Sequence, residues 1–186
     1  VALRDVDSNP AIDAADPRRA PATDQRGFVR DAEPDIGAFE LLDPPDILIT
    51  GRRGHEIARG DYDPSTLDGT DFGTAVVDGS ALVQSFTLVN QGESPLVLAG
   101  PPVLPSGWSD AFSIIREPNA TIAAGASSSF DVSFEPSSTG LHRTNVRVVS
   151  NDPDEPDYQF QVQGTGRAEP QITAPSARND AFTVNV

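Results

Sequence analysis

Hydrophobic and polar residues alternate along much of the chain between residues 46 and 166, with the two-residue period of a β-strand. In residues 129–135 and 158–163 the alternation is strict, so one face of each segment is hydrophobic and the other is polar. The pattern predicts short strands at residues 47–50, 86–89, 96–98, 112–115, 130–134, 146–149 and 158–162. After residue 45 the sequence shows no amphipathic helical stripe of useful length.

Turn-forming residues separate these segments, mostly at intervals of 10 to 18 residues. They are Asp68-Gly69, Asp78-Gly79, Gln91-Gly92, Ser106-Gly107, Ala124-Gly125, Thr139-Gly140, Asn151-Asp152-Pro153 and Gly164-Thr165-Gly166. A sheet with one hydrophobic face needs a second layer to cover it, and short strands between regular turns are typical of sandwiches. The sequence therefore predicts an all-β fold, an immunoglobulin-like antiparallel β-sandwich of seven to eight strands over residues 46–166.

The two flanking segments differ from this pattern. Prolines interrupt every hydrophobic stretch of residues 1–45, where the longest strand candidate is 36–41. We interpret this segment as the end of a preceding domain, followed by a stiff Pro44-Pro45 junction, because it is too short to build its own core. Residues 167–186 are interpreted as a polar linker and, at 181–184, the first strand of a further unit. Since the sequence contains no methionine, we expect it to be an interior part of a longer protein.

Composition narrows the range of partners. The formal net charge is −15, with 28 acidic residues against 13 arginines and no lysine. Such a surface repels nucleic acids and anionic membranes, and no hydrophobic run of 18 residues is present, so neither nucleic-acid binding nor membrane insertion is expected. Without cysteine the chain has no disulfide, no thiolate nucleophile and no cysteine-ligated metal, and its redox compartment stays open.

Four aspartates crowd one predicted loop and raise the question of calcium binding. Asp61, Asp63, Asp68 and Asp71 lie among backbone carbonyls and glycines, and Ca²⁺ takes six to eight oxygen ligands. Their spacing is not that of an EF-hand, and the final bidentate glutamate of that motif is missing. Turn and capping roles are therefore favoured, and calcium binding is left open.

Three short motifs match known functional signatures only in part. His55-Glu56 begins like the zinc-binding motif H-E-x-x-H, but Arg59 stands where the second histidine belongs. Arg59-Gly60-Asp61 is the tripeptide that integrins recognise, although its last two residues also suit a turn. Asn119-Ala120-Thr121 is a glycosylation sequon only in a host that glycosylates. No nucleophile elbow or phosphate loop is present, so we expect no enzyme, no catalytic, cofactor-binding or metal-binding residues and no cofactor.

A series of further motifs runs through the middle of the chain. They are Asp68-Gly69-Thr70-Asp71-Phe72-Gly73, Phe86-x-Leu88-x-Asn90-x-Gly92, Leu96-x-Leu98, Thr121-Ile122-Ala123-x-Gly125, Val132-x-Phe134-x-Pro136, Gly140, Ser150-Asn151-Asp152 and Gly164-Thr165-Gly166. In order and spacing, this region resembles the Hydin-type (ASH, PapD-like) immunoglobulin-like modules often labelled choice-of-anchor D in bacterial surface and secreted proteins. It departs from that pattern at Arg52, Arg53 and Arg59, where small or hydrophobic residues are more usual. The resemblance implies a β-sandwich and carries over no catalytic residue.

Both flanks carry resemblances of their own. Residues 9–14, 24–28 and 35–40 resemble the closing segment of choice-of-anchor Q proteins, which are secreted right-handed parallel β-helices. Residues 178–184 resemble the opening of a cadherin-like tandem repeat. These resemblances imply that residues 1–45 end a β-helix domain, residues 46–166 form the sandwich, and residues 167–186 lead into a following repeat. They also imply an extracellular or cell-surface location.

We therefore expect a non-catalytic spacer or adhesion-type module of a large secreted or surface protein, with neighbouring domains of the same chain as partners. One alternative is a carbohydrate- or protein-binding accessory module of a polysaccharide-acting β-helix protein. Trp108, Tyr62 and Tyr158 are then the candidate stacking platforms, although aromatic residues make up only 6% of the chain. A second alternative is a ciliary or cytoskeletal Hydin-type interaction domain, which the extracellular resemblance of the flanks disfavours. The ligand, protein or glycan, is left open.

Overall fold

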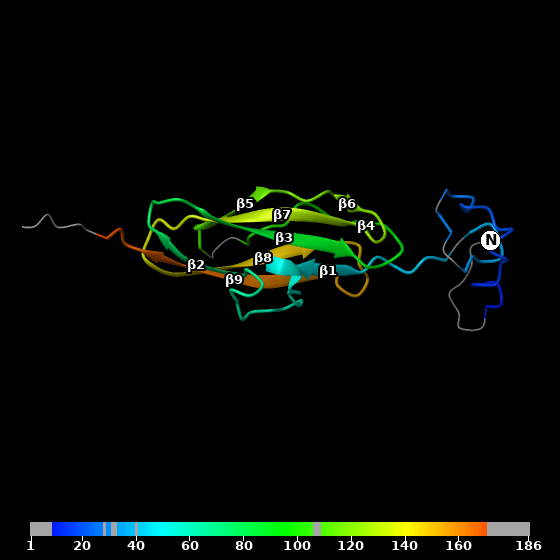
Figure 1. Ribbon diagram of the computed structural model, residues 1–186, viewed down its shortest axis with the longest axis horizontal. Helices are drawn as coiled ribbons and strands as arrows, with labels where there is room; N and C mark the ends of the chain where they lie inside the picture. Colours follow the sequence, from blue (N-terminus) through cyan, green and yellow to red (C-terminus); the bar gives the residue numbers. More distant parts are fainter. Residues whose placement is uncertain (1–8, 28, 31–32, 40, 106–108, 171–186) are drawn as a thin grey trace, which may run out of the picture.

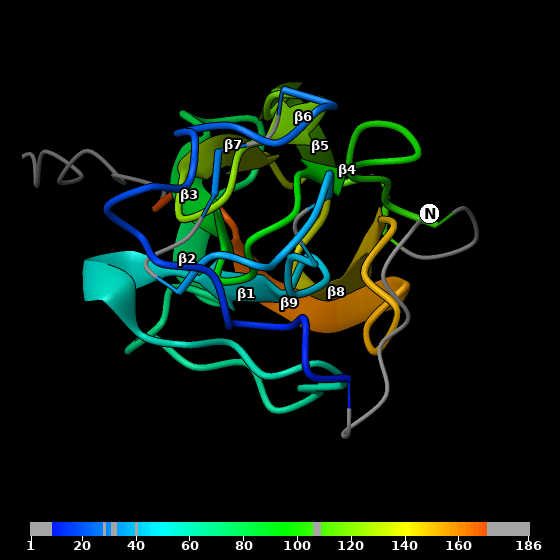
Figure 2. The same ribbon diagram turned by 90° about the vertical axis from the view of Figure 1, so that its right-hand side faces the viewer.

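A computed structural model describes residues 9–27, 29–30, 33–39, 41–105 and 109–170. Nine strands and one short 3-10 turn, η1 (Arg52–Gly54), occupy this part of the chain. The strands form two layers that face one another, and the N-terminal segment lies beyond one end of them (Figures 1 and 2). Among the described residues, no helix has the length and hydrophobicity needed to cross a membrane.

Two sheets make up the sandwich. The first has the order β1-β3-β7-β5, formed by Ile47–Thr50, Leu82–Asn90, Ser127–Phe134 and Phe112–Arg116. The second has the order β2-β9-β8, formed by Asp71–Val76, Asp157–Arg167 and Gly140–Val149. β4 (Leu96–Val97) and β6 (Thr121–Ile122) form a separate, short antiparallel pair. Neighbouring strands are antiparallel except for β2 and β9, which are parallel.

Phenylalanine side chains fill the space between the two sheets. Phe86 of β3 and Phe160 of β9 are fully buried, and their ring centroids are 5.3 Å apart across the sandwich. Phe112 of β5 and Phe134 of β7 stack with their centroids 4.7 Å apart. Each fully buried phenylalanine contributes roughly 1.5–3 kcal/mol to folding, so these rings account for much of the stability of the core. The alternating hydrophobic positions of the sequence therefore face one common core.

All seven predicted strands are present, and the immunoglobulin-like sandwich is confirmed. β2 was not predicted, because its pattern is interrupted. Gly73 has φ +78°, and the register of β2 against β9 shifts between Asp71 and Thr74. Phe72 and Ala75 therefore both face the core although they are three residues apart, which breaks the two-residue period. The sheets are antiparallel as expected except at this strand, since β2 runs parallel to β9.

Gly164 and Gly166 lie inside β9, so the turn predicted at Gly164-Thr165-Gly166 is wrong. A Cβ atom on Gly164 would lie 2.5 Å from the Phe134 ring, and one on Gly166 would collide with the carbonyl oxygen of Ser138. Glycine is required at both positions because neighbouring groups pass too close to leave room for a side chain. The strand continues to Arg167, which sequence reasoning had assigned to the linker.

Asn90 gives a physical meaning to the Asn-x-Gly motif at the end of β3. Its side chain is fully buried, and its Oδ1 accepts hydrogen bonds from the N–H groups of Gly92 (3.1 Å) and Asp46 (3.3 Å). Its Nδ2 donates to the carbonyls of Ser94 (2.8 Å) and Ile122 (3.1 Å). One amide therefore ties the end of β3 to the beginning of β1 and to β6.

The described residues between 9 and 42 form little regular structure. The strand candidate at residues 36–41 does not form a strand over the described residues 36–39, which form bends and extended chain. Asp35 is only 2% exposed, and its carboxylate accepts hydrogen bonds from the N–H groups of Asp13 (2.8 Å) and Leu41 (2.5 Å). The buried Asp35 carboxylate thus holds together two parts of this segment that are far apart in the sequence.

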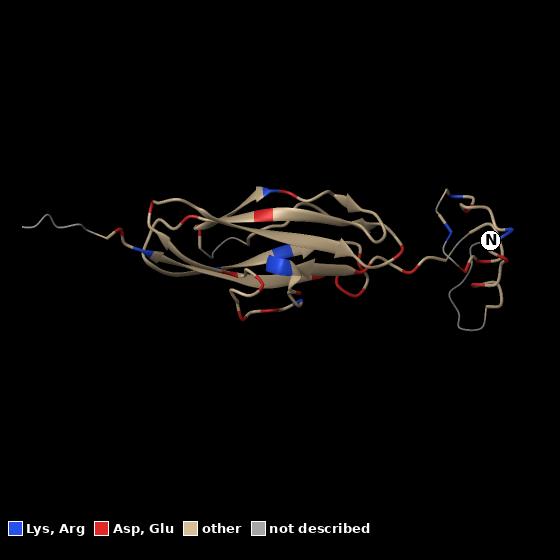
Figure 3. Ribbon diagram, in the orientation of Figure 1, with Lys and Arg blue, Asp and Glu red and all other residues tan. Residues whose placement is uncertain are grey.

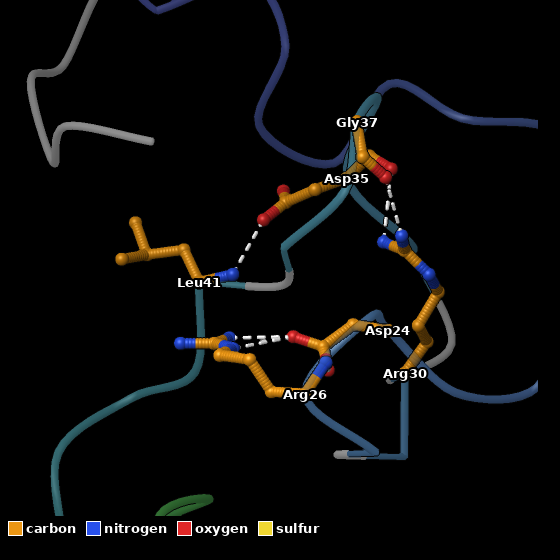
Figure 4. A network of polar contacts seen from close by, with 6 residues as sticks. All are labelled: Asp24, Arg26, Arg30, Asp35, Gly37 and Leu41. Atoms are coloured by element: carbon orange, nitrogen blue, oxygen red, sulfur yellow. Dashed lines mark hydrogen bonds and ion pairs between the residues drawn. The ribbon is translucent and has the colours of Figure 1, made fainter. Parts of the chain in front are cut away.

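Two arginines extend the same polar network (Figure 4). Arg30 donates to the carbonyl oxygens of Asp35 (3.1 Å) and Gly37 (2.6 Å). The Asp24 carboxylate, whose side chain is fully buried, pairs with the Arg26 guanidinium at 2.6 Å. These contacts give the N-terminal segment a defined conformation without a core of its own.

The chain enters and leaves the sandwich at opposite ends (Figure 1). Ile47, the first residue of β1, pairs with Asn90 at the end of β3. Arg167, the last residue of β9, pairs with Val76 of β2, at the end of the sandwich where β3 begins. The eleven residues of β9 extend roughly 36 Å, over most of the length of the sandwich.

Acidic residues are distributed over turns, loops and the N-terminal segment instead of forming one face (Figure 3). Asp131 of β7 is an acidic residue within a strand, and its carboxylate pairs with the Arg116 guanidinium at 2.7 Å. The predicted turn at Ser106-Gly107, Trp108 and the predicted strand at 181–184 lie outside the described residues.

Candidate functional site at the Tyr62 groove

Three of the four aspartates considered for calcium, Asp61, Asp68 and Asp71, act as acceptors in turns and side-chain contacts. Asp61 Oδ1 accepts the N–H of Asp63 (2.9 Å), and Asp68 Oδ1 accepts both the N–H (2.8 Å) and the hydroxyl (2.6 Å) of Thr70. Asp71 Oδ1 accepts the N–H of Gly73 at 2.8 Å. For Asp61, Asp68 and Asp71, the geometry thus shows the turn and capping roles favoured from the sequence.

A different acidic group is brought together at the end of the sandwich near β1. Carboxylate oxygens of Asp46, Asp152 and Glu155 lie within 4.8 Å of one another. Asp152 is 2% exposed, and its two oxygens accept the N–H groups of Ile47 (2.7 Å), Asp154 (2.8 Å) and Glu155 (2.9 Å). Burial raises the pKa of Glu155, and the negative charges of Asp152, Asp154 and Asp46 raise it further. Asp152 therefore fastens the turn between β8 and β9 to the start of β1.

The Arg59-Gly60-Asp61 tripeptide is bonded along its backbone to β9. The N–H of Gly60 donates to the carbonyl of Gln159 (2.7 Å), and the carbonyl of Asp61 accepts the N–H of Gln161 (2.8 Å). Gly60 has φ +78°, a conformation that favours glycine. The tripeptide therefore extends the second sheet, next to Phe160, and does not form the tip of a loop.

Of the three candidate platforms, only Tyr62 presents an exposed ring in the described residues, with 55% of its surface accessible. Tyr158 was wrongly assigned to this role. It is 4% exposed, faces the core from β9, and its hydroxyl donates to the carbonyl of Ile57 at 2.6 Å. Trp108 lies outside the described residues.

Two sequence motifs remain, the partial zinc-binding motif at His55-Glu56 and the glycosylation sequon at Asn119. His55 has extended backbone at the end of η1, and Glu56 pairs with Thr50, so the helix that a zinc-binding H-E-x-x-H motif needs is not formed there. Asn119 lies exposed between β5 and β6, and its N–H donates to the Ser128 hydroxyl at 2.8 Å.

A groove of about 470 Å³ lies beside Tyr62. It is lined by Arg59, Gly60, Tyr62, Glu155, Asp157 and Gln159, and we call it the Tyr62 groove. One wall is the loop that follows η1, and the other is the start of β9 with the preceding turn. The loop lies along β9 on the lower side of Figure 1. The volume of the groove falls within the usual range of small-molecule sites.

Hydrogen bonds hold three of the side chains that line the groove, those of Asp157, Gln159 and Arg59. The Arg147 guanidinium donates two hydrogen bonds of 2.9 Å to the Asp157 carboxylate, and these bonds hold the pKa of Asp157 below its usual range. Gln159 Nε2 also donates to Asp157 at 3.1 Å, and Arg59 Nη1 donates to the carbonyl of Asp154 at 3.3 Å. The groove thus presents a carboxylate, an amide and a guanidinium held by hydrogen bonds, with the Tyr62 ring and the Glu155 carboxylate beside them.

Sequence reasoning found Tyr62 but missed Glu155, Asp157 and Gln159 as its neighbours. The alternating glutamines of residues 159–163 were recognised only as the polar face of a strand. The missing information was the parallel pairing that brings Asp61 beside Phe160.

A second groove, of about 410 Å³, separates the N-terminal segment from the sandwich. It is lined by Arg26, Leu41, Leu42, Ser94, Pro95, Val97 and Asn151. Near it, the carbonyl of Asp43 accepts the N–H of Ser94 at 3.0 Å, and this contact joins the junction to the sandwich.

Comparisons with solved structures found weak similarities. A protein of unknown function from Porphyromonas gingivalis W83 is 15% identical with a TM-score of 0.45, and the match covers 66% of each chain. Vibrio cholerae VesB protease is 17% identical with a TM-score of 0.40, over 52% of this chain and 29% of that one. PapD-like domain 7 of human CEP192 is 12% identical with a TM-score of 0.42, over 75% and 98%. The matched part thus spans less than a third of the VesB chain.

Among curated proteins, no sequence matches significantly. A family model, in contrast, matches residues 61–165, which is more than half of the chain. Its description is HYDIN/CFA65/VesB-like, Ig-like domain, and the matched residues span β2 to β9 together with the loop that carries Tyr62. The chain therefore belongs to the HYDIN/CFA65/VesB-like Ig-like domain family.

Proposed function

We propose that the sandwich is a non-catalytic spacer and interaction module of a large multidomain protein. The observation that carries this proposal is the position of Ile47 and Arg167 at opposite ends of the sandwich (Figure 1). A domain whose chain enters at one end and leaves at the other adds its full length between its neighbours. Its partners are then the units before and after it in the same chain.

Contacts at both ends support a rigid connection. At the first end, the Asp152 carboxylate accepts the N–H of Ile47, and the carbonyl of Asp46 accepts the N–H of Gln91 at 2.8 Å. At the other end, the N–H of Val77 donates to the carbonyl of Arg167 at 2.9 Å. The prolines Pro44 and Pro45 further restrict the backbone just before β1.

We further propose that this protein is extracellular or on the cell surface, and that residues 1–45 end a parallel β-helix. The resemblance of both flanks to secreted proteins supports this setting. The ordered polar network around Asp24 and Asp35 fits a segment that closes a preceding unit. Antibody labelling of intact and of permeabilised cells distinguishes the locations. Labelling only after permeabilisation would favour the intracellular alternative, a ciliary or cytoskeletal interaction domain.

The spacer proposal can be tested by distance measurements between spin labels, because the chain has no cysteine of its own. One doubly labelled variant, Gln91→Cys with Glu169→Cys, measures the length of the sandwich. A second, Arg18→Cys with Glu169→Cys, adds the N-terminal segment. All three positions are exposed.

We expect a narrow distance distribution for both variants and a longer mean distance for the Arg18 variant. A broad distribution, or an Arg18 distance no longer than the Gln91 distance, would contradict a rigid in-line spacer. The Gln91 variant serves as the control, since it reports only on the sandwich.

A further inference from the structure

We propose that the Tyr62 groove binds a neutral oligosaccharide. The Tyr62 ring is exposed at the edge of a groove whose other side chains are polar. An exposed aromatic ring beside fixed hydrogen-bonding groups suits a ligand that has a hydrophobic face and polar edges. A pyranose ring is such a ligand, because its axial C–H groups form a flat face while its hydroxyl groups surround the rim.

The hydrogen-bonding groups of the groove match hydroxyls in particular. The carboxylates of Glu155 and Asp157 only accept when ionised, the Arg59 guanidinium only donates, and the Gln159 amide does both. A hydroxyl group both donates and accepts, so neighbouring hydroxyls of a sugar can bond to all of these groups. A phosphate, sulfate or carboxylate only accepts, and it would face two carboxylates.

The charges around the groove favour a ligand without net charge. Asp157 is already neutralised by its bidentate ion pair with Arg147. Glu155 and Arg59 then remain as one acid and one base on opposite walls. The formal charge of −15 on the whole chain further disfavours acidic polysaccharides.

The groove is organised before a ligand binds. Asp61, directly before Tyr62, is bonded through its carbonyl to the N–H of Gln161, and the N–H of Asp63, directly after Tyr62, donates to the Asp61 carboxylate. The backbone before Tyr62 is therefore fixed to β9, and the backbone after Tyr62 is fixed to the Asp61 side chain. Binding at such a site costs little conformational entropy of the loop, so a small number of contacts is sufficient for measurable binding.

Titration of the isotope-labelled full chain with cellohexaose, maltohexaose and laminarihexaose, followed by amide NMR shifts, tests the proposal. We expect at least one hexasaccharide to shift the amides of Gly60, Tyr62 and Gln159 in a saturable manner. Tyr62→Ala should weaken this binding about tenfold or more, whereas Tyr62→Phe, which keeps the ring, should stay within about threefold. Leu67→Ala, an exposed residue of the same loop outside the groove, is the matched control and should bind as the unchanged chain does.

Two results would overturn the proposal. The first is no shift of these amides with any of the three sugars at about 10 mM, which excludes even weak binding. The second is binding that Tyr62→Ala leaves intact, which places the sugar elsewhere. Binding of an integrin ectodomain without any saccharide binding would point to a protein ligand and likewise overturn it. The spin-label distances do not depend on this groove, so the spacer and saccharide proposals can fail separately.

Discussion

The hydroxyl of Tyr158 donates to the carbonyl of Ile57 at 2.6 Å, which joins two residues 101 positions apart in the chain. Both side chains are buried, and the N–H of Ile57 donates to the carbonyl of Ile49 in β1 at 2.9 Å. Ile57 is thus bonded on one side to the first sheet and on the other to β9 of the second. The contact fixes the loop that carries Tyr62 against the sandwich.

Replacing Tyr158 by phenylalanine should lower the free energy of unfolding by about 1–3 kcal/mol, because the buried carbonyl of Ile57 then lacks a donor. Urea unfolding of the full chain measures the change. Tyr62→Phe removes a hydroxyl from the exposed tyrosine and should leave the unfolding free energy unchanged. Equal stability of Tyr158→Phe and the unchanged chain would show that the hydrogen bond contributes nothing.

Stability should also fall at alkaline pH because of the same residue. Burial raises the pKa of Tyr158 to about 12, and the charges of Glu56 and Glu155 add to this increase. The unfolded chain releases this proton from about pH 10, whereas the folded chain keeps it until about pH 12. The free energy of unfolding is therefore expected to fall by roughly 2–3 kcal/mol between these pH values.

The chain suits this measurement because it has no lysine or cysteine and only two tyrosines. Urea unfolding between pH 9 and pH 12 gives the slope. Tyr158→Phe is the control, and in this variant the alkaline loss of stability should be much smaller. A steep loss that persists in Tyr158→Phe would assign the effect to other groups.

Gly164→Ala should destabilise the sandwich by about 1–3 kcal/mol, because the new methyl group would overlap the Phe134 ring in the core. Thermal unfolding followed by circular dichroism detects the change. Gly100→Ala is the matched control, since a Cβ atom there meets nothing within 4 Å. If both variants melt together, the close approach at Gly164 does not constrain the fold.

Asp152→Ala should lower the free energy of unfolding by about 2 kcal/mol or more, because the N–H groups of Ile47, Asp154 and Glu155 all lose their acceptor. Asp154→Ala removes a neighbouring acidic side chain and tests whether charge alone matters. We expect it to change stability far less. The same loss in both variants would mean that the acidic cluster acts through its charge and not through these three hydrogen bonds.

The strands that could be predicted from the sequence are those in which every second side chain is buried. Phe130, Val132 and Phe134 are all fully buried, as their alternation with polar residues indicates. β2 escaped prediction because the irregularity at Gly73 places its two buried residues three positions apart. Gly164 was misassigned for a related reason, since glycine occurs both in turns and where another group passes close to a strand.

The candidate site was harder to predict than the fold. Tyr158 shares the alternation of Phe160 and Val162, so its burial was already implied by the strand pattern, and its assignment as a platform contradicted that pattern. The neighbours of Tyr62 depend on the pairing of Asp61 with Phe160, residues about one hundred positions apart. No local pattern of residues specifies such a pairing, because it is determined by how the whole sandwich closes.

The opposite positions of Ile47 and Arg167 also determine how the sandwich responds to a pulling force. Tension between its neighbours acts along β1 and β9, nearly parallel to the strands. Interstrand hydrogen bonds lie across that direction, so β1 must shear past β3, and β9 past β2 and β8, with many bonds loaded at the same time. Had the chain entered and left at the same end, tension would unzip these bonds one by one. The connectivity of this sandwich therefore makes it suited to stay folded under load.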